Sequence, residues 1–140
     1  MYAKQVGEEI AKNGGVVVCG GLAGVMEAVC KGAKNEGGTT IGILPGVTKF
    51  DVNAYVDIPI ITGMGIARNI VIVRTADVLI ALEGSAGTLS EIALALNIGK
   101  PVVAVNLWQI LKHENLPEDL LHFVSTPEEA VTEAVKLVKK

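Results

Sequence analysis

Short apolar runs alternate with amphipathic segments along the chain. The runs at 16–19, 78–82 and 101–105 are almost wholly apolar, which is typical of strands that helices cover on both faces. Between such runs, apolar residues recur at helical spacing, as at 2–13. Strands that alternate with helices predict an α/β fold, here a three-layer Rossmann-like domain with a mostly parallel sheet.

The same pattern gives the expected elements in order. It predicts helices at 2–13, 25–36, 66–75, 92–98 and 127–139, strands at 16–19, 40–44, 57–61, 78–82, 101–105 and 122–124, a short helix at 107–112 and a long loop at 47–56. No linker or repeat interrupts the 140 residues, so we expect a single domain over 1–140.

The order of elements has one unusual feature. Parallel α/β domains usually open with a strand, whereas this chain opens with the helix at 2–13. Either the first strand is lacking or the first ten residues form something else. A missing central strand would expose backbone ladder groups, which an oligomer contact or a rearranged strand order could cover.

Composition narrows the function classes. A formal net charge of −3 and an aromatic content of 4% argue against nucleic acid as a partner. The apolar runs are too short to span a bilayer, and charges within the first ten residues argue against a secretory leader.

Cys19 and Cys30 are not spaced as a metal clamp or redox pair, so we expect buried, reduced thiols in a cytoplasmic protein. His113 and His122 lack partners at ligand spacing, so no metal site is predicted.

Three glycine-containing turns precede helices, at 20–24, 63–65 and 84–87. In a parallel sheet all such turns lie at the carboxyl edge of the strands, where ligands bind. Amide groups fanned out at a helix N-terminus attract anions, phosphates above all. None of the turns has the spacing of an ordinary NAD-binding or P-loop motif. We therefore expect a small phosphorylated ligand. The candidate binding residues are Gly20, Gly21, Gly24, Gly84, Ser85, Gly87 and Thr88, with Asn53 in the loop that could close over them.

Two charged residues near these turns are candidates for chemistry. Glu91 follows the third turn, and Thr88–Glu91 also fits a capping box, in which Thr88 caps the helix and Glu91 bonds back to it. The helix dipole would keep Glu91 ionised, which suits a group that stabilises positive charge. Arg68 follows the second turn among apolar neighbours, and it needs an anionic partner from either the protein or a ligand.

The motifs together resemble those of the Lonely Guy group, long mislabelled lysine decarboxylases. That group has an arginine followed at a fixed distance by P-G-G-x-G-T-x-x-E, and Arg68, Gly84, Gly87, Thr88 and Glu91 match those positions. The turn at Gly20, Gly21 and Gly24 resembles the family's first glycine turn, and Gly42 to Pro45 resembles its next strand end. The family's opening strand has no counterpart here.

The resemblance implies a Rossmann-like fold and a homo-oligomer, a dimer or a tetramer. The characterised branch hydrolyses the N-glycosidic bond of nucleoside 5′-monophosphates, which would make Arg68 and Glu91 catalytic. A sister branch carries molybdenum cofactor, whose pterin is also phosphorylated. Glu83 stands where the enzymes have proline, and Ser85 where they have a second glycine. The chain is therefore nearer to the carrier-like branch, and we expect a bound nucleoside monophosphate or molybdenum cofactor without a required resident cofactor.

Overall fold

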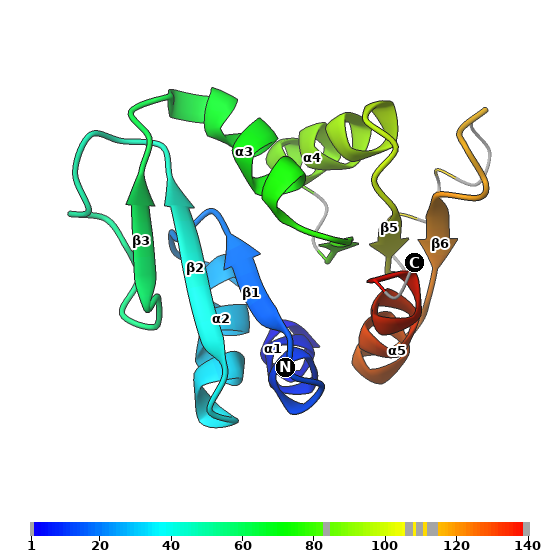
Figure 1. The fold of residues 1–140 in the computed structure, drawn as a ribbon, viewed down its shortest axis with the longest axis horizontal. Coiled ribbons are helices and arrows are strands. Elements are labelled where there is room, and N and C mark those ends of the chain that lie inside the picture. The colour runs from blue at the N-terminus through cyan, green and yellow to red at the C-terminus, as the bar shows by residue number, and fades with distance from the viewer. Residues whose placement is uncertain (1, 83–84, 106–107, 109–110, 112–114, 139–140) are drawn as a thin grey trace. The chain divides into compact units, whose positions relative to one another are not determined.

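The structure, a computed structural model, describes residues 2–82, 85–105, 108, 111 and 115–138 (Figure 1). The chain divides into two compact units, Met1–Ile72 and Val73–Lys140. The boundary falls inside the helix α3, and each unit has a small parallel sheet of its own.

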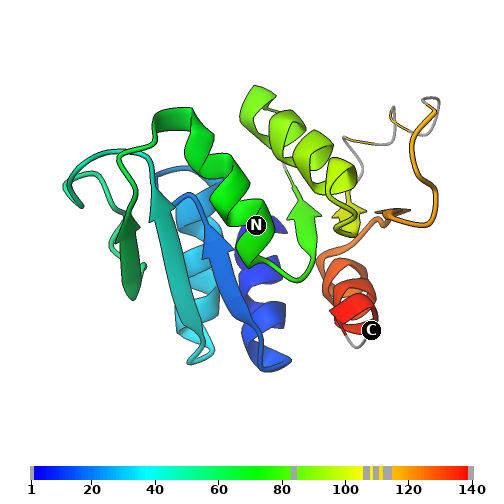
Figure 2. The ribbon, with the colours of Figure 1, turned by 45° about the horizontal axis from the view of Figure 1, so that its top comes forward.

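The first unit is a three-stranded parallel sheet with helices packed on it. Its elements are α1 (Tyr2–Lys12), β1 (Val16–Cys19), α2 (Val25–Asn35), β2 (Thr39–Leu44), β3 (Ile58–Ile61), the 3-10 helix η1 (Gly65–Ala67) and the start of α3 (Arg68–Thr75). The strand order is β1-β2-β3, with Val16 opposite Thr39 and Ile41 opposite Ile58. Both α1 and α2 lie on the same face of this sheet (Figures 1 and 2).

Two glycines allow α1 and α2 to cross at backbone distance. A Cβ atom on Gly7 would collide with the carbonyl oxygen of Val29, and one on Gly32 would collide with that of Lys4. Each glycine is itself buried, and Val6 beside Gly7 is only 1% exposed. The closeness of the crossing therefore depends on the absence of these two side chains.

The second unit is also a three-stranded parallel sheet with helices packed on it. Its elements are β4 (Leu79–Ala81), α4 (Ala86–Asn97), β5 (Val102–Ala104), β6 (Leu121–Phe123) and α5 (Pro127–Val138), and its strand order is β4-β5-β6, all parallel. Both α4 and α5 pack against β4 and β5. The core of this unit consists of Val73, Leu79, Ala81, Ile92, Ala95, Val102, Ala104, Trp108 and Leu121.

The predicted fold class is confirmed, and every predicted strand is present within one or two residues. The largest difference is α4, which begins at Ala86 rather than at 92. The short helix expected at 107–112 falls largely outside the described residues. Within the described sheets, β1 and β4 each lie at an edge and pair with one strand, β2 and β5 respectively. The single domain over 1–140 stays a prediction.

The strand β3 is poorly covered for an apolar strand. Ile58, Ile60 and Ile61 are between 41% and 47% exposed, and β3 pairs only with β2 among the described strands. Phe50 and Ile66, in the segments on either side of β3, are 90% and 84% exposed. The exposed apolar side chains of this unit thus include those of β3 and of the segments on either side of it.

The helix crossing gives a direct test of the first unit. Gly7→Ala and Gly32→Ala are each expected to lower the free energy of unfolding by about 2 kcal/mol or more, because the added methyl group forces the two backbones apart. Urea denaturation measures the change.

The matched control is Gly87→Ala in α4, where the nearest atom to the added Cβ is Ser85 Oγ at 3.9 Å. This variant is expected to be unchanged or up to about 1 kcal/mol more stable, since alanine is the better helix former. Equal effects at the three positions would contradict the close crossing.

Candidate functional site

The carboxyl ends of β1 and β2 carry the candidate site of the first unit. The turn 20–24 follows β1, and the loop 45–57 follows β2. Arg68 begins α3 after the turn 63–65. The structure therefore brings the predicted residues Gly20, Arg68 and Asn53 to the same end of this sheet.

Arg68 lies directly against Gly20. A Cβ atom on Gly20 would be 2.6 Å from Arg68 Nη2 and 2.7 Å from Met26 Sδ, so the guanidinium occupies the space that a side chain would take. Arg68 Nε donates to the Ile43 carbonyl oxygen at 2.9 Å, and Nη1 donates to Asn69 Oδ1 at 2.6 Å. Both acceptors are neutral. Within the described part of the first unit, no carboxylate forms an ion pair with Arg68.

The three glycines of the first turn differ in what surrounds them. A Cβ on Gly21 would lie 2.7 Å from Leu44 Cδ2 and 3.2 Å from the Gly42 Cα, so Gly21 allows the turn to pack on β2. Gly24 has a φ of 80°, and a Cβ added there would have no atom within 4 Å. It begins α2 without a side-chain cap. Only Gly24 of the three therefore has open space beside it.

Asn53 ties the loop to the turn. Its backbone N–H donates to the Gly21 carbonyl oxygen at 2.9 Å, its Nδ2 donates to the Leu22 carbonyl oxygen at 2.9 Å, and its Oδ1 accepts from the Tyr55 N–H at 2.9 Å. The residue is 8% exposed. Its side chain thus holds the loop against the turn, and a contact between Asn53 and a ligand stays a prediction.

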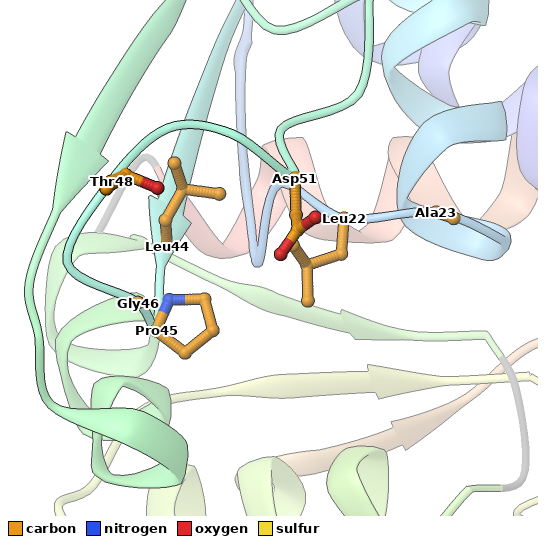
Figure 3. A pocket seen from close by; sticks show the side chains of 7 residues that line it. All are labelled: Leu22, Ala23, Leu44, Pro45, Gly46, Thr48 and Asp51. Carbon is orange, nitrogen blue, oxygen red and sulfur yellow. The ribbon is translucent and has the colours of Figure 1, made fainter.

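The turn and the loop line an open pocket of about 410 Å³ (Figure 3). Its lining consists of Leu22, Ala23, Leu44, Pro45, Gly46, Thr48 and Asp51. Sequence reasoning named none of these as binding residues. The signal in the sequence was their position, since Leu22 and Ala23 lie inside the first glycine turn and Pro45 and Gly46 end a buried strand.

In the second unit, Ser85 caps α4. Its backbone is extended, and its Oγ accepts from the Thr88 N–H at 3.2 Å and lies 2.9 Å from Thr88 Oγ1. The expectation that Thr88 is the cap, with Glu91 closing a capping box, is wrong, because the helix starts three residues earlier than that pattern requires. Glu91 instead lies in the second turn of α4 and is partly buried.

The remaining predicted residues can be placed only in part. Gly87 is exposed near the N-terminus of α4. Gly84, which was also predicted to bind the ligand, lies outside the described residues. Arg68 belongs to the first unit and Glu91 to the second, so their joint action stays a prediction. Among the described residues, no group of three His, Cys, Asp or Glu side chains could hold a metal ion.

The two cysteines are neighbours, which their spacing in the sequence did not indicate. Cys19 Sγ lies 3.6 Å from Cys30 Sγ at the end of β1, and the Gly21 N–H donates to Cys19 Sγ at 3.4 Å. The hydrogen bond with Cys19 and then burial raise the pKa of the Cys30 thiol above its usual range. Cys30 is therefore a protonated, unreactive thiol at neutral pH.

Two similar proteins of known structure share the fold of this chain. The chain is similar to the molybdenum cofactor binding protein from the phototrophic bacterium Rippkaea orientalis, with 42% identity and a TM-score of 0.90 over 99% of this chain and 86% of that one. It is also similar to the molybdenum cofactor carrier protein from Chlamydomonas reinhardtii, with 35% identity and a TM-score of 0.84 over 99% and 88% of the two chains.

A more distant relative is an enzyme. The cytokinin riboside 5′-monophosphate phosphoribohydrolase from Mycobacterium tuberculosis is 33% identical over 115 residues, which cover 76% of this chain and 62% of that protein.

Parallel strands followed by glycine turns and helices define a protein of the Rossmann-like α/β class. Within that class, the chain belongs to the SLOG cluster4 family, whose model matches residues 1–131. The resemblance to the Lonely Guy group, and to its carrier branch in particular, is confirmed. No helix among the described residues is long and apolar enough to cross a membrane.

The end of the loop gives a pH-dependent prediction. Asp57 Oδ2 accepts from Lys34 Nζ at 2.9 Å and from the Thr40 N–H at 3.0 Å, and these bonds hold the pKa of Asp57 below its ordinary value. The stabilisation is therefore present at neutral pH and is lost as the pH falls through the lowered pKa. Asp57→Asn is expected to cost about 1 kcal/mol at pH 7, since the group is partly exposed.

Urea denaturation at pH 7 and at pH 3 measures this effect. The difference between wild type and Asp57→Asn is expected to shrink at the lower pH. The exposed residue Glu118 provides the control, and Glu118→Gln should change neither value. A difference that is the same at both pH values would contradict the assignment.

Proposed function

We propose that this protein binds a phosphorylated pterin or nucleotide and acts as a carrier of molybdenum cofactor. The observation that supports this most is the state of Arg68. Its guanidinium is held over Gly20 by two neutral acceptors, and its Nη2 has no hydrogen-bond partner among the described residues of the first unit. A fixed cation without a carboxylate partner is suited to an anionic ligand.

The start of α4 supports the same ligand class. The first amide groups of a helix have no partners within the helix and favour negative charge. The fold does not require a glycine at position 87. Its φ is not positive, and a Cβ added there would have only one neighbouring atom, at 3.9 Å. An exposed glycine that the fold does not need leaves room for an oxygen-rich group to approach the backbone.

The similar proteins favour molybdenum cofactor among phosphorylated ligands. Both of the molybdenum cofactor proteins described above bear names that state binding or carriage of this cofactor. In this proposal the cofactor is cargo. The protein orients and shelters it, and its own residues need only hold the phosphate and the ring system.

Arg68 is the residue to test. The protein is produced in cells that make molybdenum cofactor and is purified by gel filtration. The molybdenum content per chain of Arg68→Gln is then expected to be lower than that of wild type by a factor of about ten or more. A charge-assisted hydrogen bond contributes about 1.5–3 kcal/mol, and 1.4 kcal/mol corresponds to a factor of about ten. Elemental analysis of the purified protein provides the measurement.

Arg74→Gln is the matched control, because Arg74 is the second arginine of α3 and is exposed. It should retain as much molybdenum as wild type. Arg68→Lys keeps the charge without the planar fork and should fall between the two. Equal retention by Arg68→Gln and Arg74→Gln, with both variants folded, would rule out a role for Arg68 in holding the cargo.

A second candidate function is hydrolysis of the N-glycosidic bond of a nucleoside 5′-monophosphate. The observation that favours it is a partly buried Glu91 in a chain 33% identical over 115 residues to a phosphoribohydrolase. In this reaction Glu91 would stabilise the oxocarbenium-like ribose and orient the attacking water, as carboxylates do in glycoside cleavage. Arg68 would bind phosphate or stabilise the departing base.

Incubation with AMP distinguishes the two functions. If the protein is a hydrolase, chromatography detects free adenine with wild type, and Glu91→Ala reduces the rate by at least about a hundredfold. Glu128→Ala, at the start of α5, should leave the rate unchanged. Absence of free base with AMP, GMP, CMP and UMP would eliminate the enzymatic function and leave the carrier proposal intact.

We further propose a homo-oligomer in the cytoplasm. The exposed apolar side chains of β3, Phe50 and Ile66 are candidates for contact with a second copy. Cys19 and Cys30 are free thiols, which are typical of proteins in a reducing compartment.

A further inference from the structure

We infer that the pocket between the turn 20–24 and the loop 45–51 selects a heterocycle with two adjacent N–H donors, and that the Asp51 carboxylate reads this edge. The 2-amino-4-oxo edge of a pterin has this pattern, and so does the corresponding edge of guanine. Adenine does not. The inference rests on the proposed function, because it names the ring that accompanies the phosphate.

The pocket has the size and walls of a ring-binding site. Its volume of about 410 Å³ lies within the usual range for small-molecule sites, which is about 300–1,000 Å³. Leu22, Leu44 and Pro45 supply apolar walls from two different segments (Figure 3). Apolar walls around a few polar groups favour a flat ring whose edge carries the hydrogen-bonding groups.

The charge of the pocket determines which part of the ligand enters it. Asp51 is the one ionisable residue among the seven that line it. An ionised carboxylate repels phosphate and can only accept hydrogen bonds. The phosphate therefore binds elsewhere, and the group facing Asp51 is a donor.

Two carboxylate oxygens match two parallel N–H groups. Such bidentate pairs are stronger and more specific than single hydrogen bonds. Guanine and pterin present a ring N–H beside an exocyclic amino group. Adenine presents its amino group beside an unprotonated ring nitrogen, whose lone pair would face the carboxylate. Asp51 therefore favours the first two rings over adenine.

Thr48 supplies the complementary group. Its Oγ1 accepts from the Phe50 N–H at 3.2 Å, which leaves its hydroxyl hydrogen to donate. The oxo group of guanine or pterin is adjacent to the ring N–H and accepts such a bond. Among the side chains that line the pocket, Asp51 thus offers acceptors for two donors, and Thr48 offers a donor for the oxo group. The turn 49–52, which contains Asp51, is closed by the Val52 N–H, which donates to the Lys49 carbonyl oxygen at 3.3 Å.

Titration calorimetry with GMP, IMP and AMP tests the inference, since IMP keeps the oxo group and the ring N–H but lacks the amino group. Wild type is expected to bind GMP at least about tenfold more tightly than AMP, with IMP between them. Asp51→Asn should bring the GMP and AMP affinities within about threefold, because an amide offers one donor and one acceptor. Thr48→Val should weaken GMP and IMP without affecting AMP.

The control is Asp119→Asn, an exposed aspartate of the second unit, which should preserve the wild-type order. If Asp51→Asn binds the nucleotides with the wild-type ratio of GMP to AMP affinity, the inference is overturned while the proposed function stands. If wild type binds AMP as tightly as GMP, the inference is likewise overturned. If wild type binds no nucleotide and retains no molybdenum cofactor, the proposed function fails and the inference fails with it.

Discussion

The contact between Arg68 and Gly20 is the constraint on which the candidate site depends. A guanidinium can occupy this position only because residue 20 has no side chain, and it stays there because the Ile43 carbonyl oxygen accepts from Nε. The contact joins the end of β1, the end of β2 and the start of α3 through one side chain. Under the proposed function, a cation fixed in this way would lose less entropy when a ligand binds.

A second constraint holds the loop 45–57. Loops of this length without regular structure are uncommon in compact domains unless they serve a site. Here Asn53 binds the turn 20–24 near the middle of the loop, and Asp57 binds Thr40 and Lys34 at its end. The pocket wall formed by Pro45 to Asp51 is therefore supported from within the first unit.

The order of strands and helices could be predicted because the strands are short apolar runs and the segments between them have apolar residues at helical spacing. The glycine turns at 20–24 and 63–65 could be predicted from their places before helices, whereas Gly87 of the third predicted turn already lies in α4. The start of α4 could not, because Thr88 and Ser85 are both common capping residues and only the backbone decides between them. The proximity of Cys19 and Cys30 depends on how α2 packs on β1, which no local pattern contains. The pocket was missed for a related reason. Leu22, Leu44 and Pro45 are ordinary apolar residues, and only their convergence makes them a wall.

The glycines of this chain are held in place by different demands. Those at 7 and 32 are required by another helix pressed against them, whereas Gly87 has open space around its Cα. A lineage that kept the fold would therefore retain glycine at 7 and 32, whatever became of the ligand. If the ligand binds at Gly87 as proposed, its loss would let position 87 drift toward alanine and other good helix formers. Under the proposed function, the residue at position 87 would then record whether the ligand was still bound.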